Sequence, residues 1–394
     1  MKMKKAAAVA LTAALSLALL AGCGSDGKQA DANGGESAGD GVFKIGAIGP
    51  VTGGAAVYGE AVKNGAELAV KEINEAGGIN GVKIEFNYQD DENDAEKAVN
   101  AYNTLKDWGM QMLLGTVTSA PCVAVGEVAQ EDNMFMLTPS GTAVDCVKYD
   151  NAFRVCFSDP MQGLESAKYI GEKGLATKVA AIYDSSDVYS TGIYNAFAEE
   201  AENQNFEIVA AEAFTSESKS DFSVQLQKAK DAGAELVFLP FYYSEASLVL
   251  KQAAGMNYSP IFFGCDGMDG ILAVEGFDAN LANDLIFLSP FTPTSDDEAI
   301  KKFVTDFEAA YGGTPNQFAA DAYDGIYAIK AAIEKGSVTA DMSASDICDS
   351  LKTAMTEITI DGVTAKSLTW EASGEPSKEP MVVKIADGDY AVVE

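Results

Sequence analysis

The sequence contains no histidine. Histidine is the commonest general base in enzymes, so its absence excludes Ser-His-Asp and Cys-His catalytic arrangements and removes histidine-based zinc sites. The chain also lacks a Cys-x-x-Cys pair, which is a frequent redox and zinc signature. The composition therefore disfavours hydrolytic chemistry, and we expect no cofactor, no metal and no enzymatic activity.

Basic residues are scarce as well. Lysine and arginine number 27 against 59 aspartates and glutamates, which gives a formal net charge of −32. So acidic a surface repels nucleic acid and anionic lipid headgroups, and it keeps a secreted protein in solution. We therefore expect no nucleic-acid partner.

The first glycine-rich turn of the chain does not have the sequence of a nucleotide-binding loop. The turn IGPVTGGAAVYGE at residues 48–60 follows an apolar run and opens a helical stretch, but its glycines fit neither the dinucleotide nor the Walker spacing. A glycine-rich turn before a helix still offers free backbone N–H groups that suit any anion, carboxylates included. A plain strand-to-helix connection is the alternative.

The first 22 residues have the features of a secretory signal peptide. Three lysines precede an apolar run over residues 6–22 that is short for a membrane span. The run ends in Leu-Ala-Gly-Cys, which resembles a bacterial lipobox and implies removal of residues 1–22 and lipidation of Cys23; an ordinary signal peptide with a chance cysteine is the alternative. Residues 23–41 are rich in Gly, Ser, Asp and Ala and predict a disordered tether. We expect an extracytoplasmic protein, lipid-anchored to the bacterial cell membrane, where little ATP or NAD is present.

The cysteine count leaves the pairing open. With Cys23 lipidated, at least one of the five remaining cysteines is unpaired unless it joins another chain. Cys122 and Cys146 are a candidate bridge because both lie just beyond predicted strand ends. The remaining cysteines are Cys122, Cys146, Cys156, Cys265 and Cys348.

An acidic cluster, DDEND, precedes one of the helical stretches. A calcium loop of the EF-hand type starting at Asp90 would need glycine at position 95 and glutamate at position 101, and both are alanine. Asn93 as a helix N-cap, with Glu96 three residues later, explains the cluster without a metal.

Short β-like runs alternate with helical stretches along the rest of the chain. The first such stretch places Tyr58, Val62, Ala66, Ala69 and Ile73 on one face. Strands alternating with helices predict parallel sheets with right-handed crossovers, and the alternation occurs in two series. We therefore predict an α/β fold of two doubly wound, Rossmann-like lobes joined by a multi-strand hinge. Since open α/β sheets bind ligands at the carboxyl ends of their strands, the lobes would enclose a shared cleft.

The end of the chain is divided between the lobes. Helical stretches at 296–311 and 316–335 have no β-run after them and are assigned to the first lobe, whereas the last strands, around an ADGD turn, are assigned to the second. The predicted lobes comprise residues 42–157 plus 289–365, and residues 158–288 plus 366–394.

Polar side chains follow several of the predicted strands. N-capping or turn chemistry explains each one taken singly. Together they suggest a polar cup in which hydroxyls and free amides hold a carboxylate, an acid holds an ammonium and tyrosines form the walls, as an α-amino acid requires. The side chains are Thr116, Thr118, Ser119, Ser140, Thr142, Asp184, Asp187, Tyr189, Tyr242, Tyr243 and Asp266.

Three segments carry a resemblance to a known family. These are IGPVTGGAAVYGEAVKNGAELAVKEINEAGGINGVKIEF, DFSVQLQKAKDAGAELVFLPFYYSEASLVLKQA and NQFAADAYDGIYAI. With them the chain, from about residue 42 to its end, resembles the leucine/isoleucine/valine-binding family of type I periplasmic binding proteins, the receptors of amino-acid ABC importers.

The resemblance implies a set of ligand-binding residues. Ser119, the Ser140 backbone amide and Thr142 would hold the ligand carboxylate, and Asp266 would take the ammonium. The cavity lining would be Tyr58, Tyr189, Tyr242 and Phe318, with Val117 near the ligand side chain. The role of Asp321, an acid near Phe318, is left open, with a satisfied helix residue as the simpler interpretation.

The resemblance implies a substrate-binding lipoprotein, expected to be a monomer. It would capture an amino acid, branched-chain or otherwise hydrophobic, by hinge closure and present it to the ABC permease subunits in the membrane. One alternative is an amino-acid sensor that signals through a partner. A surface hydrolase acting through Ser119 or Asp266 is another, but it lacks an evident activating base.

Overall fold

The computed structural model describes residues 41–393. The predicted signal peptide, Cys23 and the tether up to residue 40 lie outside the described residues. Within the described range, no helix has both the length and the apolar character needed to cross a membrane.

The first sheet has five parallel strands in the order β2-β1-β3-β4-β5. They are β1 (Phe43–Ile48), β2 (Ile84–Gln89), β3 (Met112–Gly115), β4 (Met136–Thr138) and β5 (Ala152–Arg154). The central strands β3 and β4 are buried along their whole length, as expected for strands covered by helices on both faces. These strands correspond to the first predicted series.

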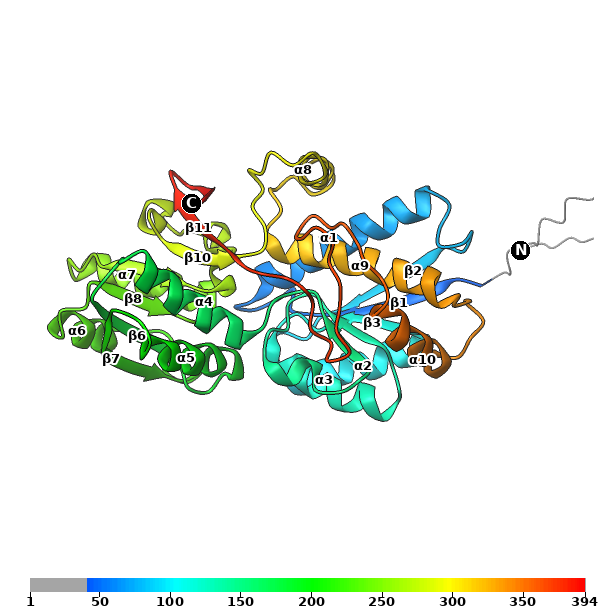
Figure 1. Ribbon diagram of the computed structural model, residues 1–394, viewed down its shortest axis with the longest axis horizontal. Helices are drawn as coiled ribbons and strands as arrows, with labels where there is room; N and C mark the ends of the chain where they lie inside the picture. The colour runs from blue at the N-terminus through cyan, green and yellow to red at the C-terminus, as the bar shows by residue number, and fades with distance from the viewer. Residues whose placement is uncertain (1–40, 394) are drawn as a thin grey trace, which may run out of the picture. The chain divides into compact units, whose positions relative to one another are not determined.

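Two layers of helices cover this sheet. One cluster of buried side chains joins α1 and α9 to the sheet, and another joins α2 and α3. The predicted face of α1, including Tyr58 and Ile73, is buried. Helices α1 and α9 lie side by side (Figure 1), and a Cβ at Gly65 would meet the Ala319 carbonyl oxygen at 2.0 Å, so this glycine permits the close backbone contact. The helices are α1 (Ala56–Glu75), α2 (Ala95–Trp108), α3 (Ser119–Glu131), α8 (Glu298–Tyr311), α9 (Gln317–Gly336) and α10 (Ala344–Met355).

The second sheet has seven strands in the order β12-β11-β10-β9-β8-β6-β7. Strands β6 to β10 pair in parallel, whereas β11 and β12 are antiparallel additions at the β10 edge. The strands are β6 (Lys178–Asp184), β7 (Glu207–Phe214), β8 (Leu236–Leu239), β9 (Ile261–Gly264), β10 (Ile286–Ser289), β11 (Met381–Ala386) and β12 (Asp389–Val392), and the associated helices are α4 (Asp159–Glu172), α5 (Val188–Ala201), α6 (Ser223–Asp231) and α7 (Tyr243–Gly255). Both the second series and the return of the last strands to this sheet are as predicted.

The chain passes from one sheet to the other after β5, after β10 and before β11. The last passage runs along the first sheet before it leaves: the Arg154 N–H donates to the Gly374 carbonyl at 3.0 Å, and the Trp370 indole N–H donates to the Arg154 carbonyl at 2.7 Å. Residues up to at least 375 are therefore attached to β5.

Two local predictions are wrong. Helix α2 is capped by Asp94, whose side chain accepts from the Lys97 N–H at 2.9 Å, and not by Asn93. Asn93 has a φ of 59°, so the left-handed turn extends one residue further before the helix starts. The candidate bridge between Cys122 and Cys146 is not formed, since the five described cysteines are free and buried. The two thiols are nevertheless neighbours, and the Cys146 thiol also lies 3.8 Å from the Ser119 carbonyl oxygen.

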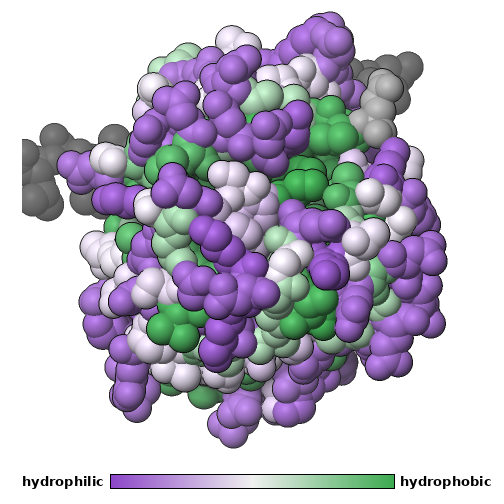
Figure 2. Space-filling model, turned by 90° about the vertical axis from the view of Figure 1, so that its left-hand side faces the viewer, coloured by the Kyte–Doolittle hydropathy of each residue, from purple (hydrophilic) through white to green (hydrophobic). Residues whose placement is uncertain are grey.

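The visible surface is largely hydrophilic, and some of the acids in its loops accept hydrogen bonds from neighbouring residues. Hydrophilic residues cover most of the face shown in Figure 2, with small hydrophobic areas between them. Some of the loop acids have local structural roles: Asp90 accepts from the Val51 N–H at 3.0 Å and the Thr52 hydroxyl at 2.7 Å. Such bonds explain the acidic cluster as turn chemistry.

Candidate functional site

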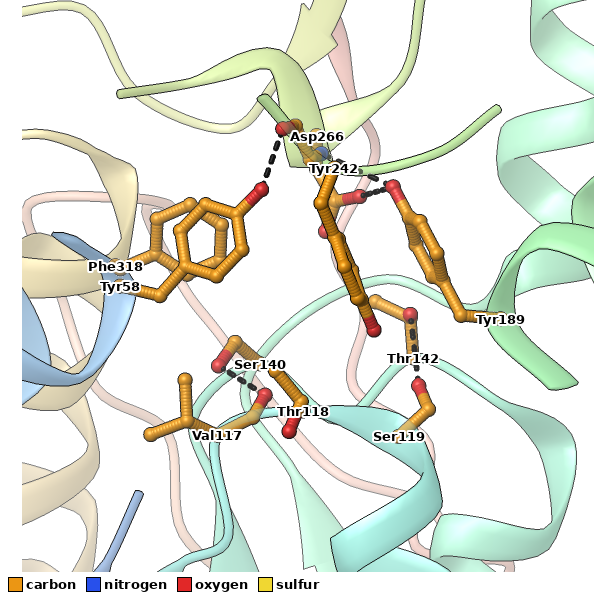
Figure 3. Close-up of a pocket in the computed structure, with 11 residues that line it drawn as sticks. Tyr58, Val117, Thr118, Ser119, Ser140, Thr142, Tyr189, Tyr242, Asp266 and Phe318 are labelled. Carbon is orange, nitrogen blue, oxygen red and sulfur yellow. Dashed lines mark hydrogen bonds between the residues drawn. The ribbon is translucent and has the colours of Figure 1, made fainter. Parts of the chain in front are cut away.

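One pocket is lined by every side chain that the resemblance implied (Figure 3). It is formed by the loops after β3 and β4 of the first sheet and by the ends of β6, β8 and β9 of the second, with α1 and α9 completing the wall. The carboxyl ends of parallel strands meet at one edge of each sheet, which explains why residues so distant in sequence converge here. The lining residues are Tyr58, Val117, Thr118, Ser119, Ser140, Thr142, Tyr189, Tyr242, Asp266, Gly267 and Phe318.

One side of the pocket is rich in hydrogen-bond donors. Ser119 is the first residue of α3, so its N–H belongs to the group of helix amides that lack intrahelical partners. Its Oγ accepts from the Ala143 N–H at 3.2 Å and lies 3.5 Å from the Thr142 hydroxyl. The backbone N–H groups of Ser140 and Thr142 have no partner among the described residues. This side of the pocket can bind a carboxylate.

The opposite side carries a buried acid. Asp266 Oδ1 accepts from the Tyr189 hydroxyl at 2.6 Å, and the Asp266 N–H donates to Gln162 Oε1 at 3.0 Å. Burial raises the pKa of Asp266 to about 6, although the hydrogen bonds from Tyr189 and Gln162 oppose that rise. No lysine or arginine of the described range is ion-paired with it. The carboxylate is therefore placed to accept a cation from a ligand.

Aromatic rings form the walls between these two sides. Tyr58 and Phe318 pack with their centroids 4.3 Å apart, and Tyr189 stacks on Tyr242 at 4.9 Å. The Tyr58 hydroxyl donates to the Gly267 carbonyl at 2.5 Å and accepts from the Tyr243 N–H at 3.2 Å. Tyr58 belongs to α1, whereas Gly267 follows β9 and Tyr243 is the first residue of α7, so these bonds link α1 to the second sheet across the pocket.

The remaining strand-end residues have structural roles. Asp187 caps α5 by accepting from the Tyr189 N–H at 3.1 Å, and Asp184 accepts from the Ser186 N–H at 2.8 Å. Tyr243 Oη accepts from the Val57 N–H at 3.3 Å. Thr116 Oγ1 donates to the Thr118 carbonyl at 3.4 Å. Only some of the strand-end polar residues predicted to form the polar cup therefore line the pocket.

Sequence reasoning missed an acid beside the pocket. Asp159, the first residue of α4, is buried, and neither of its carboxylate oxygens has a hydrogen-bond partner among the described residues. Burial raises its pKa well above the ordinary value; the Thr142 hydroxyl and the Arg154 charge oppose that rise, whereas the charges of Asp266 and Asp187 add to it. An aspartate at the start of a helix is common for capping reasons, so no sequence signal distinguished this one.

The free space in the pocket is about 10 Å³, roughly the room that one water molecule needs, so the lining side chains nearly fill it.

Comparison with known proteins agrees with this geometry. The family model described as periplasmic binding protein matches residues 42–389. The chain belongs to this family. It is a family of extracytoplasmic binding proteins and not of enzymes, and its type I fold of two mostly parallel sheets is the one predicted.

Relatives and solved structures extend the comparison. The chain is 32% identical to the Leu/Ile/Val-binding protein homolog 3 of Brucella melitensis, over 76% of this chain and 81% of the relative. It is 29% identical to the leucine-, isoleucine-, valine-, threonine- and alanine-binding protein of Pseudomonas aeruginosa, over 74% and 78% of the two chains. The branched-chain amino acid transporter substrate binding protein of Streptococcus pneumoniae, solved in complex with isoleucine, is 30% identical and covers 89% of this chain and 99% of its own, with a TM-score of 0.81.

Proposed function

We propose that this protein is a lipid-anchored substrate-binding protein that captures a free amino acid with a branched or otherwise hydrophobic side chain and presents it to an ABC importer. The observation that carries the proposal is the polarity of the pocket: free N–H groups and hydroxyls stand on one side, and an acid without a cationic partner stands on the other. An α-amino acid brings a carboxylate and an ammonium that complement these two sides.

The ligand side chain would contact apolar surface. Val117, Tyr58 and Phe318 lie on the wall between the two polar sides, and Tyr58 is 1% exposed. Burying an aliphatic side chain against such a surface is favourable, at roughly 25 cal/mol per Å². Relatives named as binding leucine, isoleucine and valine support the same ligand class.

The lobes of this proposal follow the two sheets. The chain crosses near residues 154–157, 285–289 and, for the last time, between Gly374 and β11. The contacts of Trp370 and Gly374 with β5 favour a last boundary nearer residue 380 than residue 366. Closure of the lobes around the ligand would shift the population from an open to a closed form without breaking a bond.

A binding panel tests the amino-acid assignment. Wild-type protein lacking residues 1–22 would be titrated by calorimetry with the twenty common L-amino acids, and thermal shifts would be measured in parallel. We expect at least one of leucine, isoleucine, valine or phenylalanine to bind and to raise the melting temperature. A panel without any binding would contradict the proposal.

The anchor and the importer need separate tests. Replacing Cys23 by serine should abolish incorporation of a labelled fatty acid and release the protein from the membrane. Genes for a permease and an ATPase beside this gene would support import, whereas a neighbouring signalling receptor would favour a sensor.

A further inference from the structure

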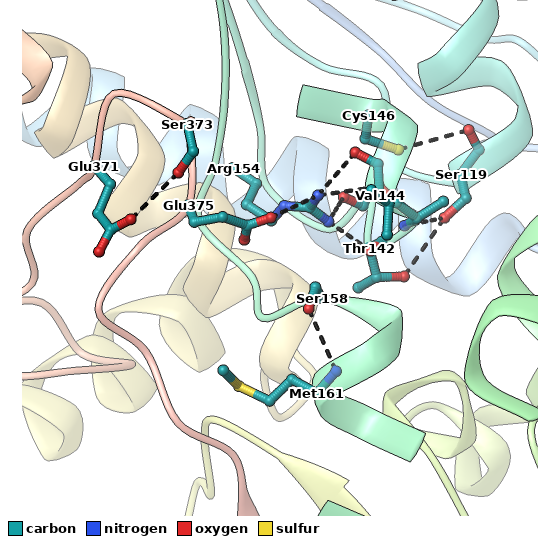
Figure 4. Close-up of polar contacts among 12 residues, drawn as sticks. Ser119, Thr142, Val144, Cys146, Arg154, Ser158, Met161, Glu371, Ser373 and Glu375 are labelled. Atoms are coloured by element: carbon teal, nitrogen blue, oxygen red, sulfur yellow. Dashed lines mark hydrogen bonds and ion pairs between the residues drawn. The ribbon is translucent and has the colours of Figure 1, made fainter. Parts of the chain in front are cut away.

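Arg154 is the only arginine in the sequence. It ends β5, and its side chain is fully buried. Its guanidinium donates from one nitrogen to the carbonyls of Gly141 at 3.1 Å and Thr142 at 2.5 Å, and from the other to that of Ala143 at 3.1 Å (Figure 4). The buried guanidinium thus forms its hydrogen bonds with backbone carbonyls of the loop that follows β4.

These bonds orient the peptide groups of the loop. In a trans peptide the carbonyl of one residue and the N–H of the next point in opposite directions. Since the Gly141 carbonyl faces Arg154, the Thr142 N–H points away from it, and this N–H has no partner among the described residues. Since the Thr142 carbonyl also faces Arg154, the Ala143 N–H is directed to Ser119 Oγ.

The guanidinium itself is held by the last crossing segment. Glu375 Oε1 lies 3.2 Å from it, and the Glu375 side chain is 37% exposed whereas that of Arg154 is not exposed at all. The Gly374 carbonyl and the Trp370 indole hold the Arg154 backbone. Glu375 is the one carboxylate within ion-pair distance of Arg154 in the described range.

We propose that Arg154 is the positioning residue of the carboxylate-binding loop, and that Glu375 holds its guanidinium in place from outside the pocket. The inference rests on the proposed function, because it assigns the loop a carboxylate ligand. Neither residue lines the pocket, so each acts through the peptide groups of residues 141–143 and through Ser119. A lysine could not replace Arg154, because a single ammonium lacks the planar fork that grips several carbonyls at once.

The proposed role of Glu375 predicts a change in ligand affinity opposite in direction to the change expected from electrostatics alone. Replacing Glu375 by glutamine removes a negative charge near the loop, which by Coulomb attraction alone would strengthen the binding of a carboxylate. If Glu375 positions Arg154, the same change releases the guanidinium and weakens binding. Glu371, four residues earlier on the same segment, makes no contact with Arg154 that the structure shows and provides a matched control.

Calorimetry with L-leucine, L-isoleucine and L-valine would compare wild type with Glu375→Gln, Glu371→Gln and Arg154→Lys. We expect Glu375→Gln to lower the affinity for the tightest-binding of these ligands by about three- to tenfold, which is the effect of losing a partly exposed charged hydrogen bond. Arg154→Lys should lower the affinity by more than about tenfold. Glu371→Gln should stay within about twofold of wild type. Equal affinities for the two glutamine variants, or tighter binding by Glu375→Gln, would overturn the proposal.

Hydrogen exchange of the ligand-free protein gives a readout that does not depend on the ligand. Amides of residues 140–144 should exchange faster in Glu375→Gln than in wild type or Glu371→Gln, while peptides of α9 stay unchanged. If no amino acid binds wild type, the proposed function fails, and the exchange of this loop still decides the inference. Unchanged exchange in Glu375→Gln would refute the positioning role even if amino acids bind.

Discussion

Asp266 is a buried carboxylate whose hydrogen-bond partners are all neutral. The Tyr189 hydroxyl bonds its carboxylate, and the Gln162 side chain bonds its backbone N–H. An uncompensated charge in such a place is costly, which is why burial raises its pKa to about 6. A ligand ammonium would supply the missing cation and restore the ionised form.

The first prediction follows from this environment. Asp266→Asn keeps the shape and one acceptor oxygen, so folding should be little affected. The affinity for the amino acid identified by the panel should fall by roughly 1.5–3 kcal/mol, about ten- to two-hundredfold, because a charged hydrogen bond is lost. Ser119→Ala should cost less, since backbone amides would still hold the carboxylate. Titration calorimetry measures both.

The matching α-keto acid is the control for Asp266. It keeps the carboxylate and lacks the ammonium, so it should bind wild type poorly and lose little more in Asp266→Asn. Equal amino-acid affinity in the mutant and wild type would show that Asp266 is a turn residue and that the ammonium site lies elsewhere, with the unpartnered Asp159 as the next residue to test.

Helix α9 connects the pocket to the last crossing segment. At its start, the Gln317 N–H donates to Asp269 Oδ2 and its side-chain amide to the Asp266 carbonyl, both at 2.9 Å, while Phe318 lines the pocket. One turn further on, Asp321 accepts from Lys378 Nζ at 2.6 Å, with both side chains buried. The acid whose role the sequence left open is therefore a satisfied helix residue.

Breaking this pair should destabilise the protein. Lys378→Met would leave Asp321 buried without its cation, at a cost of about 3–5 kcal/mol in the free energy of unfolding, measured by denaturant titration. The double variant Asp321→Asn with Lys378→Met should lose less than the single one, because Asp321 then carries no charge and only Asp324, which Lys378 also stabilises, is left without the cation.

The control for this pair lies on the same segment. Lys366 pairs with Asp297 at 3.2 Å, with its side chain 52% exposed. Lys366→Met should therefore cost under about 1 kcal/mol. Equal losses for Lys366→Met and Lys378→Met would mean that burial of the Asp321 pair contributes nothing.

At the scale of the whole molecule, the bonds of Tyr58 join α1 to the segment after β9 and to the start of α7, both of which belong to the second sheet's side of the pocket. If the lobes close around ligand, small-angle scattering should show a smaller radius of gyration at saturating amino acid. Tyr58→Phe removes both bonds of the hydroxyl, so ligand-bound mutant protein should be less compact than ligand-bound wild type. If the radius of gyration of the wild-type protein does not change when ligand is added, the protein is already closed without ligand.

Several buried acids predict an unusual pH dependence of stability. Burial raises the pKa of Asp91 to about 7 and those of Asp187, Asp266 and Asp269 to about 6. An unfolded aspartate has a pKa of about 3.9, so between about pH 4 and 7 the folded protein binds more protons than the unfolded chain. Stability should therefore fall as the pH rises through this window.

Thermal melts of the ligand-free protein test this dependence. The midpoint should be higher at about pH 5 than at about pH 8, and lower net negative charge at the acidic end acts in the same direction. Asp91→Asn should reduce the difference, because Asp91 has one buried oxygen without a partner and the highest of these pKa values. A midpoint that rises with pH would contradict the assignment of raised pKa values.

The sequence alone determined the fold class and the location of the pocket. Alternation of β-runs and helical stretches specifies parallel sheets, and in parallel sheets the strand ends meet at one edge. Ser119, Ser140 and Asp266 follow strand ends, so their convergence could be predicted from local pattern and from the family resemblance. The aromatic lining residues were predicted from the family resemblance, because the pattern alone does not distinguish a tyrosine that lines a pocket from one that packs in the core.

Only the tertiary structure decided which polar groups support that pocket. Trp370 and Arg154 are 216 positions apart, and Asp321 and Lys378 are 57 apart on a helix and an irregular segment. Such pairs have no periodicity, because each depends on where the last crossing segment lies against β5 and α9. The unpartnered Asp159 and the free thiols of Cys122 and Cys146 are likewise properties of packing. Local pattern specifies elements and the edge at which they meet, whereas charge pairing inside the molecule depends on three-dimensional neighbours that one sequence does not display.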